Sequence, residues 1–232
     1  MNRTLPVIRM QLVNRQTFVW LPLIILGSAF VITLAVYAII HNATGGTDGM
    51  YGGGAQAPLW YFMIVGVYAL TLSFPFSLAM SVTRREFYLG TLLTAAMTSL
   101  IMALVFVIGG MIETVTGGWG MRGYFFRLDW LWEAGDVVAG LFYFVIAMLF
   151  FVIGFWGATL YKRFGPMGLT IALLGVAVVL LGLVWLITAT ASWVAVWETV
   201  VGAGPLGLTL WAALLTAVLA VSAFPMFRRL VA

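Results

Sequence analysis

Residues 18–40 read FVWLPLIILGSAFVITLAVYAII, a run of 23 residues without a charged side chain. At about 1.5 Å per residue, a helix of this length measures roughly 35 Å and can cross a hydrocarbon core of about 30 Å. The run is also longer than the apolar region of a secretory signal peptide, which is about 7–15 residues. Together with five further apolar runs it predicts spans at about 18–40, 59–80, 91–112, 137–160, 167–189 and 206–226.

The charged residues alternate between the two ends of these runs. Nine of the eleven basic residues lie in four short segments, at Arg3, Arg9, Arg15, Arg84, Arg85, Lys162, Arg163, Arg228 and Arg229. Six of the seven acidic residues lie in the intervening segments, at Asp48, Glu113, Asp129, Glu133, Asp136 and Glu198. Because Lys and Arg are retained on the cytoplasmic side, the pattern predicts an all-α protein of the cell membrane with six spans and both termini in the cytoplasm.

Composition excludes several other classes of protein. With 64% hydrophobic and only 8% charged residues, the chain is not an ordinary soluble domain, and we expect one transmembrane domain over residues 1–232. The net charge of +4 is spread among loop ends rather than gathered in a stripe, so we expect lipid and no nucleic acid as a partner. The absence of cysteine excludes disulfides and thiolate chemistry.

The middle of every predicted span lacks Asp, Glu, Lys, Arg and His. Carriers coupled to protons or sodium commonly bind the ion through such groups, so this class is disfavoured. The single histidine, His41, lies at a membrane boundary, and neither a serine protease nor a metalloprotease can be assembled around it. We therefore expect no enzyme, no metal site and no cofactor in this chain.

Three segments outside the spans have recognisable features. Residues 1–17 predict a basic helix along the inner membrane surface. Residues 113–136 mix aromatic and charged side chains, which suits the outer headgroup layer. Residues 192–205 are too apolar for water and too short to span, so we expect a re-entrant or interfacial helix that breaks at 202–205. Within the second span, Pro75 predicts a kink.

The internal segment SVTRREFYLGT, residues 81–91, combines charge with aromatic residues. Thr83 and Glu86 have the spacing of a capping box, which predicts that a helix begins here before the membrane is reached. Its first turn would then display Arg84, Arg85, Glu86, Phe87 and Tyr88 to the cytoplasm.

This segment resembles the loop between spans two and three in the permease subunits of ABC-2 type transporters, especially the short six-span type of Gram-positive bacteria. YKRFG, residues 161–165, is similar to the loop between spans four and five of that group. The basic N-terminal helix, the six spans and the broken helix before the last span extend the likeness to the whole chain. At Ser81 relatives often carry glycine, which puts the tightness of the turn in question.

The resemblance implies a permease that works with separate ATPases. The chain has no Walker A sequence, so ATP and Mg²⁺ would bind to two partner ATPase subunits, and a second permease, identical or homologous, would complete the assembly. The segment from Thr83 to Tyr88 would couple to the ATPase, with Phe87 and Tyr88 as packing anchors. Lys162 and Arg163 would lie in a second inner loop. Export of a hydrophobic molecule, lipid or peptide is the expected activity.

Two other functions remain open from the sequence. A substrate-capture subunit of an uptake transporter is also small and six-spanned, but it would carry a well-defined polar pocket near the outer face. A non-transporting scaffold or immunity protein would have no ATPase partner. The sequence assigns no substrate-contacting residues.

Overall fold

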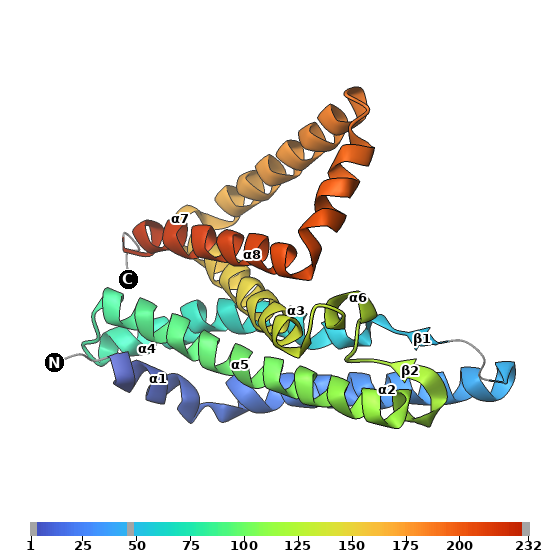
Figure 1. The fold of residues 1–232 in the computed structure, drawn as a ribbon. Helices are drawn as coiled ribbons and strands as arrows, with labels where there is room; N and C mark the ends of the chain where they lie inside the picture. Colours follow the sequence, from blue (N-terminus) through green and yellow to red (C-terminus); the bar gives the residue numbers. More distant parts are fainter. Residues whose placement is uncertain (1–3, 46–48, 229–232) are drawn as a thin grey trace.

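The computed structural model describes residues 4–45 and 49–228, so Arg3, Asp48 and Arg229 lie outside the described residues. The chain is almost entirely helical (Figure 1). Its α-helices are α1 (Thr4–Val13), α2 (Leu21–Thr44), α3 (Ala57–Tyr68), α4 (Phe74–Ala79), α5 (Arg84–Thr116), α6 (Asp129–Trp132), α7 (Asp136–Ala189) and α8 (Trp193–Arg228). Two short strands, β1 (Met50–Tyr51) and β2 (Gly123–Tyr124), pair in parallel.

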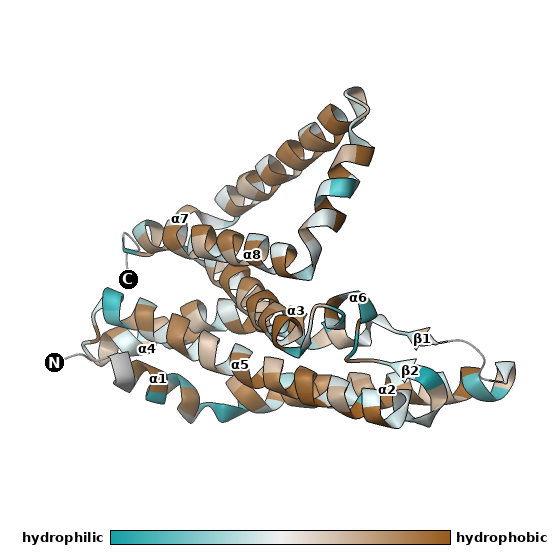
Figure 2. Cartoon of the chain, in the orientation of Figure 1, coloured by the Kyte–Doolittle hydropathy of each residue, from teal (hydrophilic) through white to brown (hydrophobic). Residues whose placement is uncertain are grey.

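Five helical stretches are long and apolar enough to cross a membrane, at Gln16–Thr44, Gly53–Ala79, Arg84–Thr116, Asp136–Ala189 and Trp193–Arg228. Hydrophobic residues dominate them, whereas many hydrophilic residues gather in α1 and near helix ends (Figure 2). A helix that is apolar all round belongs in a core or in lipid. The expectation of an all-α membrane protein is therefore confirmed.

Two of these helices are sharply broken at glycine. In α7, which is 54 residues long, Gly165 has φ 72° and ψ −176° and is followed by Pro166. In α8, Gly204 has φ 61° and ψ −175° and is followed by Pro205. The break expected at 202–205 is confirmed. Lys162 and Arg163, expected in an inner loop, are helical and lie just before the bend of α7.

The second apolar stretch is interrupted where Pro75 was expected to disturb it. A π-helical turn, η3 (Ala69–Ser73), separates α3 from α4. Proline has no N–H and its ring clashes with the carbonyl four residues earlier, here that of Thr71. The wider π turn absorbs this misfit directly upstream of Pro75.

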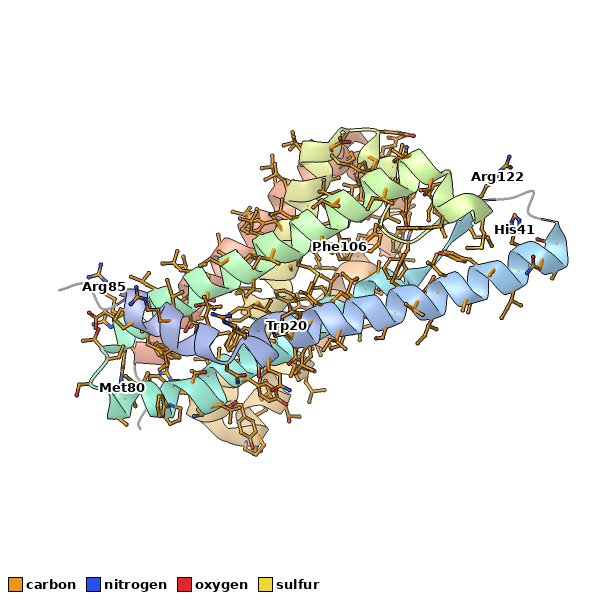
Figure 3. All side chains as sticks on the ribbon, turned by 90° about the horizontal axis from the view of Figure 1, so that it is seen from below. Trp20, His41, Met80, Arg85, Phe106 and Arg122 are labelled. Atoms are coloured by element: carbon orange, nitrogen blue, oxygen red, sulfur yellow. The ribbon has the colours of Figure 1, made fainter. Side chains whose placement is uncertain are left out.

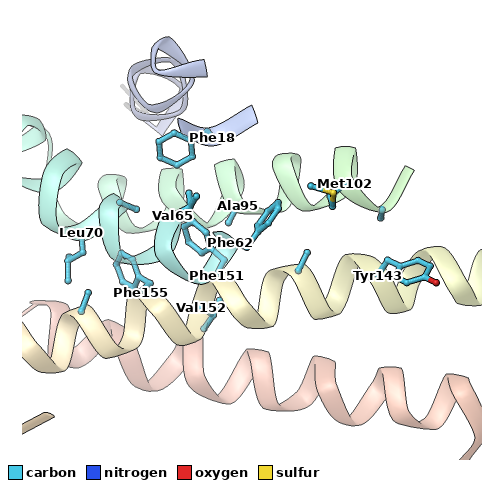
Figure 4. Close-up of a cluster of buried hydrophobic side chains, with 14 of the residues drawn as sticks. Phe18, Phe62, Val65, Leu70, Ala95, Met102, Tyr143, Phe151, Val152 and Phe155 are labelled. Carbon is cyan, nitrogen blue, oxygen red and sulfur yellow. The ribbon is translucent and has the colours of Figure 1, made fainter. Parts of the chain in front are cut away.

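The core forms where α3 and α7 cross closely. A Cβ added to Gly66 would lie 2.1 Å from the carbonyl oxygen of Phe151, and one added to Gly154 would lie 1.9 Å from that of Met63. Small residues let two membrane helices approach to backbone contact in this way. The neighbouring side chains then fill the layer between the helices, among them Phe62, Val65, Phe151, Val152 and Phe155 (Figure 4).

The segment 166–203, called the arm below, extends away from the other helices (Figure 1). It comprises the second limb of α7 and the first limb of α8. None of residues 161–208 is buried, and large side chains such as Met167, Trp185 and Trp197 are mostly exposed. The arm therefore presents an apolar surface that the rest of the chain leaves uncovered.

The helix α1 is packed against the helix bundle and is not only a basic tail. Val7 and Gln11 are buried, and the Gln11 amide donates a hydrogen bond of 2.8 Å from Nε2 to Oγ1 of Thr91 in α5. Arg9 and Arg15 stay exposed. The predicted N-terminal helix is thus present over Thr4–Val13, and one face of it is covered by protein.

Candidate functional site

The segment that was predicted to couple to a partner lies at one end of the molecule. Arg85 and Met80 lie at this end, opposite His41 and Arg122 (Figure 3). The start of α1, the bend of α7 and the end of α8 also lie here (Figure 1). We call it the arginine end. Among the described basic residues, only Arg122 and Arg127 belong to the outer segment.

The capping box at the start of α5 is confirmed. The Glu86 amide donates to Oγ1 of Thr83 at 3.3 Å, and the Thr83 amide donates to the Glu86 carboxylate at 3.1 Å. Ser81, the position at which the sequence put the tightness of the turn in question, has φ 58°. A left-handed conformation at this position explains why glycine suits the turn, and serine adopts it here.

Phe87 and Tyr88 are not displayed, so their predicted exposure as packing anchors is wrong. Phe87 is 0% exposed and Tyr88 6%. Their rings belong to a cluster that includes Phe227, with centroids 5.9 Å from each of them, and Phe74 lies 4.8 Å from Phe227. The two residues join α5 to α8 instead of facing a partner.

Polar contacts strengthen the same junction. The Tyr88 hydroxyl donates to the carbonyl of Ala220, and the Arg84 guanidinium donates to the carbonyl of Arg228. Both acceptors belong to α8, so the first turn of α5 is tied to the last turns of α8. The residues left at the surface of the predicted coupling segment are Thr83, Arg84, Arg85 and Glu86.

Lys162 and Arg163 belong to the last turn before the bend of α7. This bend lies at the arginine end (Figure 1). Lys162 is exposed, and the Arg163 guanidinium lies 4.8 Å from the ring centroid of Phe164. The fold therefore places both predicted inner segments at the arginine end.

Removing the cap should have a modest and local effect. Thr83→Ala is expected to lower the free energy of unfolding by about 1 kcal/mol, the usual cost of losing a helix cap. Thermal unfolding of the purified protein in detergent measures the change. Thr199→Ala is the control, because Thr199 is an exposed mid-helix residue that bonds only its own turn. An equal loss in both variants would contradict a capping role.

At the opposite end, Glu113 has a role that sequence reasoning missed. It lies inside α5, is 0% exposed, and accepts hydrogen bonds from three consecutive amides: Phe125 and Arg127 at 2.8 Å, and Phe126 at 3.0 Å. The Trp119 indole N–H donates to the same carboxylate at 2.9 Å. A buried carboxylate requires such donors, and here they come from the segment that closes the outer end.

Part of the outer segment is folded inward, whereas Trp130 stays exposed. Phe125, Phe126 and Trp132 are buried. Room for two of them is made by glycines of α5: a Cβ at Gly109 would lie 2.5 Å from the Phe126 ring, and one at Gly110 would lie 2.2 Å from Trp132. The outer segment, residues 113–136, therefore packs over the ends of the helices, and we call it the cover.

The surface of this cover is polar. Arg127 forms a salt bridge of 3.2 Å with Asp129. The Tyr51 hydroxyl donates a short hydrogen bond to Asp129, and this bond raises the pKa of Tyr51 to about 12. The Tyr51 ring also stacks on that of Tyr124, its partner in the paired strands, with ring centroids 5.3 Å apart. These contacts attach the segment after α2 to the segment after α5.

A cavity of about 310 Å³ lies beneath the cover, between α3, α5 and α7. Its walls include Phe106, Phe126, Phe142, Tyr143 and Phe150, and the Tyr143 hydroxyl already donates to the carbonyl of Phe126 at 2.6 Å. Gln56 is among the few polar side chains on its lining. Such a cavity suits an apolar group and offers few polar partners to a ligand.

Neither a metal site in the described residues nor a matching protein indicates the function of this chain. In the part of the chain that the structure describes, no three His, Cys, Asp or Glu residues are grouped to hold a metal ion. Comparisons with protein-family models, with curated proteins and with solved structures found no match. The geometry of the two ends is therefore the basis for the proposal that follows.

Proposed function

We propose that this chain is the membrane-spanning permease subunit of an ABC transporter, powered by two separate ATPase subunits. The chain would pair with a second permease, identical or homologous, and would move a hydrophobic molecule, lipid or peptide across the cell membrane, outward by resemblance to the ABC-2 type. It would have six spans, with the arginine end in the cytoplasm. The observation that carries the proposal is the capped, charged start of α5 at that end.

The surroundings of this helix start suit a coupling element. Thr83, Arg84, Arg85 and Glu86 form a short charged surface on a rigid turn. Directly beneath it, Phe87 and Tyr88 contact rings of α8 and α7, including Phe155 at 5.7 Å from Tyr88. A movement imposed on the surface would therefore reach three long helices through packed side chains rather than through a loop.

The bends support a count of six spans. The two limbs of α7, residues 136–164 and 166–189, each exceed the roughly 20 residues that cross a membrane. The limb of α8 after Gly204 is also long enough, whereas residues 193–203 are too short. With one span each from the three earlier stretches, the total is six, and the short limb is the proposed re-entrant or interfacial helix.

The capture-subunit alternative receives less support. Such a subunit needs polar groups to bind its substrate near the outer face, and the outer cavity is lined mainly by aromatic rings. The purification experiment below distinguishes a permease from a scaffold protein, because a scaffold would have no ATPase partner.

The test is purification of the tagged chain from native membranes in mild detergent, followed by native mass spectrometry. We expect two ATPase subunits per two permeases, and at least a tenfold loss of ATPase in Arg85→Glu. Arg84 is left unchanged because its guanidinium donates to the carbonyl of Arg228. Phe87 and Tyr88 are left unchanged because they are buried and their substitution would disturb the fold. Arg122→Glu, at the opposite end, is the matched control. A native chain without any ATPase would contradict the proposal.

A further inference from the structure

A groove of about 310 Å³ runs between α5 and α8 at the arginine end. Leu89 and Leu92 of α5 form one wall, Val221 and Phe224 of α8 form the other, and Arg85 lies at the mouth. The backbone polar group nearest its floor is already satisfied, because the carbonyl of Ala220 accepts from the Tyr88 hydroxyl. The interior of the groove is thus almost entirely hydrocarbon.

The rim of the groove is positively charged. Arg85 is exposed, and its guanidinium makes no hydrogen bond or ion pair with the described residues. The Arg228 guanidinium lies 5.7 Å from the ring centroid of Phe224, which lines the groove. The carboxylate of Glu86, the acidic group closest in sequence, is engaged in the capping box.

An apolar groove with a guanidinium at its mouth is complementary to one kind of molecule. The walls suit an aliphatic chain, and a guanidinium binds a phosphate through two parallel hydrogen bonds. Basic pockets between membrane helices near the cytoplasmic surface bind anionic lipid headgroups. A volume near 300 Å³ is at the lower end of the range for ligand pockets, so it admits one chain rather than several.

We propose that this groove binds an anionic phospholipid, with one acyl chain between α5 and α8 and the phosphate at Arg85. The acyl chain would fill the space between α5 and α8 that lies beside the contact of Tyr88 with Ala220. This inference rests on the membrane location of the arginine end and does not depend on an ATPase partner. Its result is therefore separate from that of the purification experiment above.

The test is native mass spectrometry of the purified full chain in detergent, titrated with phosphatidylglycerol or with phosphatidylcholine of the same acyl chains. Arg85→Gln removes the charge, and Val221→Trp blocks the groove from its exposed rim, where Val221 is 73% exposed. Arg163→Gln is the control, since it removes an equal charge from the same end outside the groove. Glycerol 3-phosphate serves as a competitor that has the headgroup chemistry without a chain.

We expect phosphatidylglycerol to bind more tightly than phosphatidylcholine, because the choline cation of the latter cancels the charge of its phosphate. Arg85→Gln should lose about tenfold in affinity, as for the loss of one charge-assisted contact, and Val221→Trp a similar amount because it fills the space of the acyl chain. Arg163→Gln should bind as the native chain does, and glycerol 3-phosphate should not compete. Equal binding of both lipids, an equal loss in Arg163→Gln, or full competition by glycerol 3-phosphate would overturn the proposal. So would unchanged lipid binding in Arg85→Gln.

Discussion

Replacing Glu113 with alanine is expected to lower the free energy of unfolding by about 4 kcal/mol, because it leaves three backbone amides and one indole N–H without their acceptor. Each buried donor costs about 1–3 kcal/mol when unpaired, and water at the outer end offsets part of the total. Glu113→Gln keeps one acceptor oxygen and should lose about half as much. Thermal unfolding in detergent, followed by tryptophan fluorescence, measures both.

Hydrogen exchange of the backbone amides shows which part of the protein loses stability when Glu113 is replaced. Amides 125–127 should exchange much faster in Glu113→Ala, since the carboxylate alone accepts from them. Glu133→Gln is the matched control, because Glu133 is exposed in the same outer segment and should change stability by less than about 0.5 kcal/mol. If exchange at 125–127 stayed at the native rate in Glu113→Ala, another acceptor would have to hold the cover.

Gly154→Ala is expected to cost about 3 kcal/mol, and Gly154→Leu to prevent assembly of the bundle. The added Cβ would meet the backbone carbonyl of Met63 at 1.9 Å, and backbone cannot move aside as a flexible side chain can. The helices α3 and α7 must then separate, which opens the layer around Phe62 and Phe151. The yield of monodisperse protein and its thermal unfolding measure the two effects.

Gly157→Ala is the control in the same helix, because a Cβ there meets nothing within 4 Å. Gly66→Ala should resemble Gly154→Ala, since the two glycines allow the same approach from opposite sides. Their combination should cost less than the sum, because one separation of the helices relieves both clashes. Strict additivity would show that the two contacts are independent and would contradict this account.

Features that depend on neighbouring residues were predictable from the sequence. The cap at Thr83 requires only Glu86, and the break at Gly204 requires only Pro205. The disturbance near Pro75 likewise follows from proline chemistry. In each case the physical cause lies within one helical turn, where spacing alone specifies the contact.

Features that depend on distant partners were not predictable. Phe87 was expected at the surface because it lies in the first turn of the capped helix, but its partner Phe227 lies at the other end of the chain. Glu113 was counted as a loop charge, and nothing in its spacing from Phe125 indicates a hydrogen bond. Membrane helices are apolar all round, so periodicity does not mark which face packs against protein. The coupling role of residues 83–88 stays a prediction.

The two bends that delimit the arm restrict how this sequence can change over evolutionary time. Gly165 and Gly204 share one backbone conformation, with φ near +65° and ψ near 180°, which a residue with a β-carbon does not adopt. The prolines that follow exclude the helical alternative at both positions. The surrounding Leu, Val and Ala residues exchange readily in an exposed apolar helix. Distant relatives should therefore retain the Gly–Pro pairs at 165–166 and 204–205, and the distance between the two pairs, after most of the surrounding apolar residues have changed.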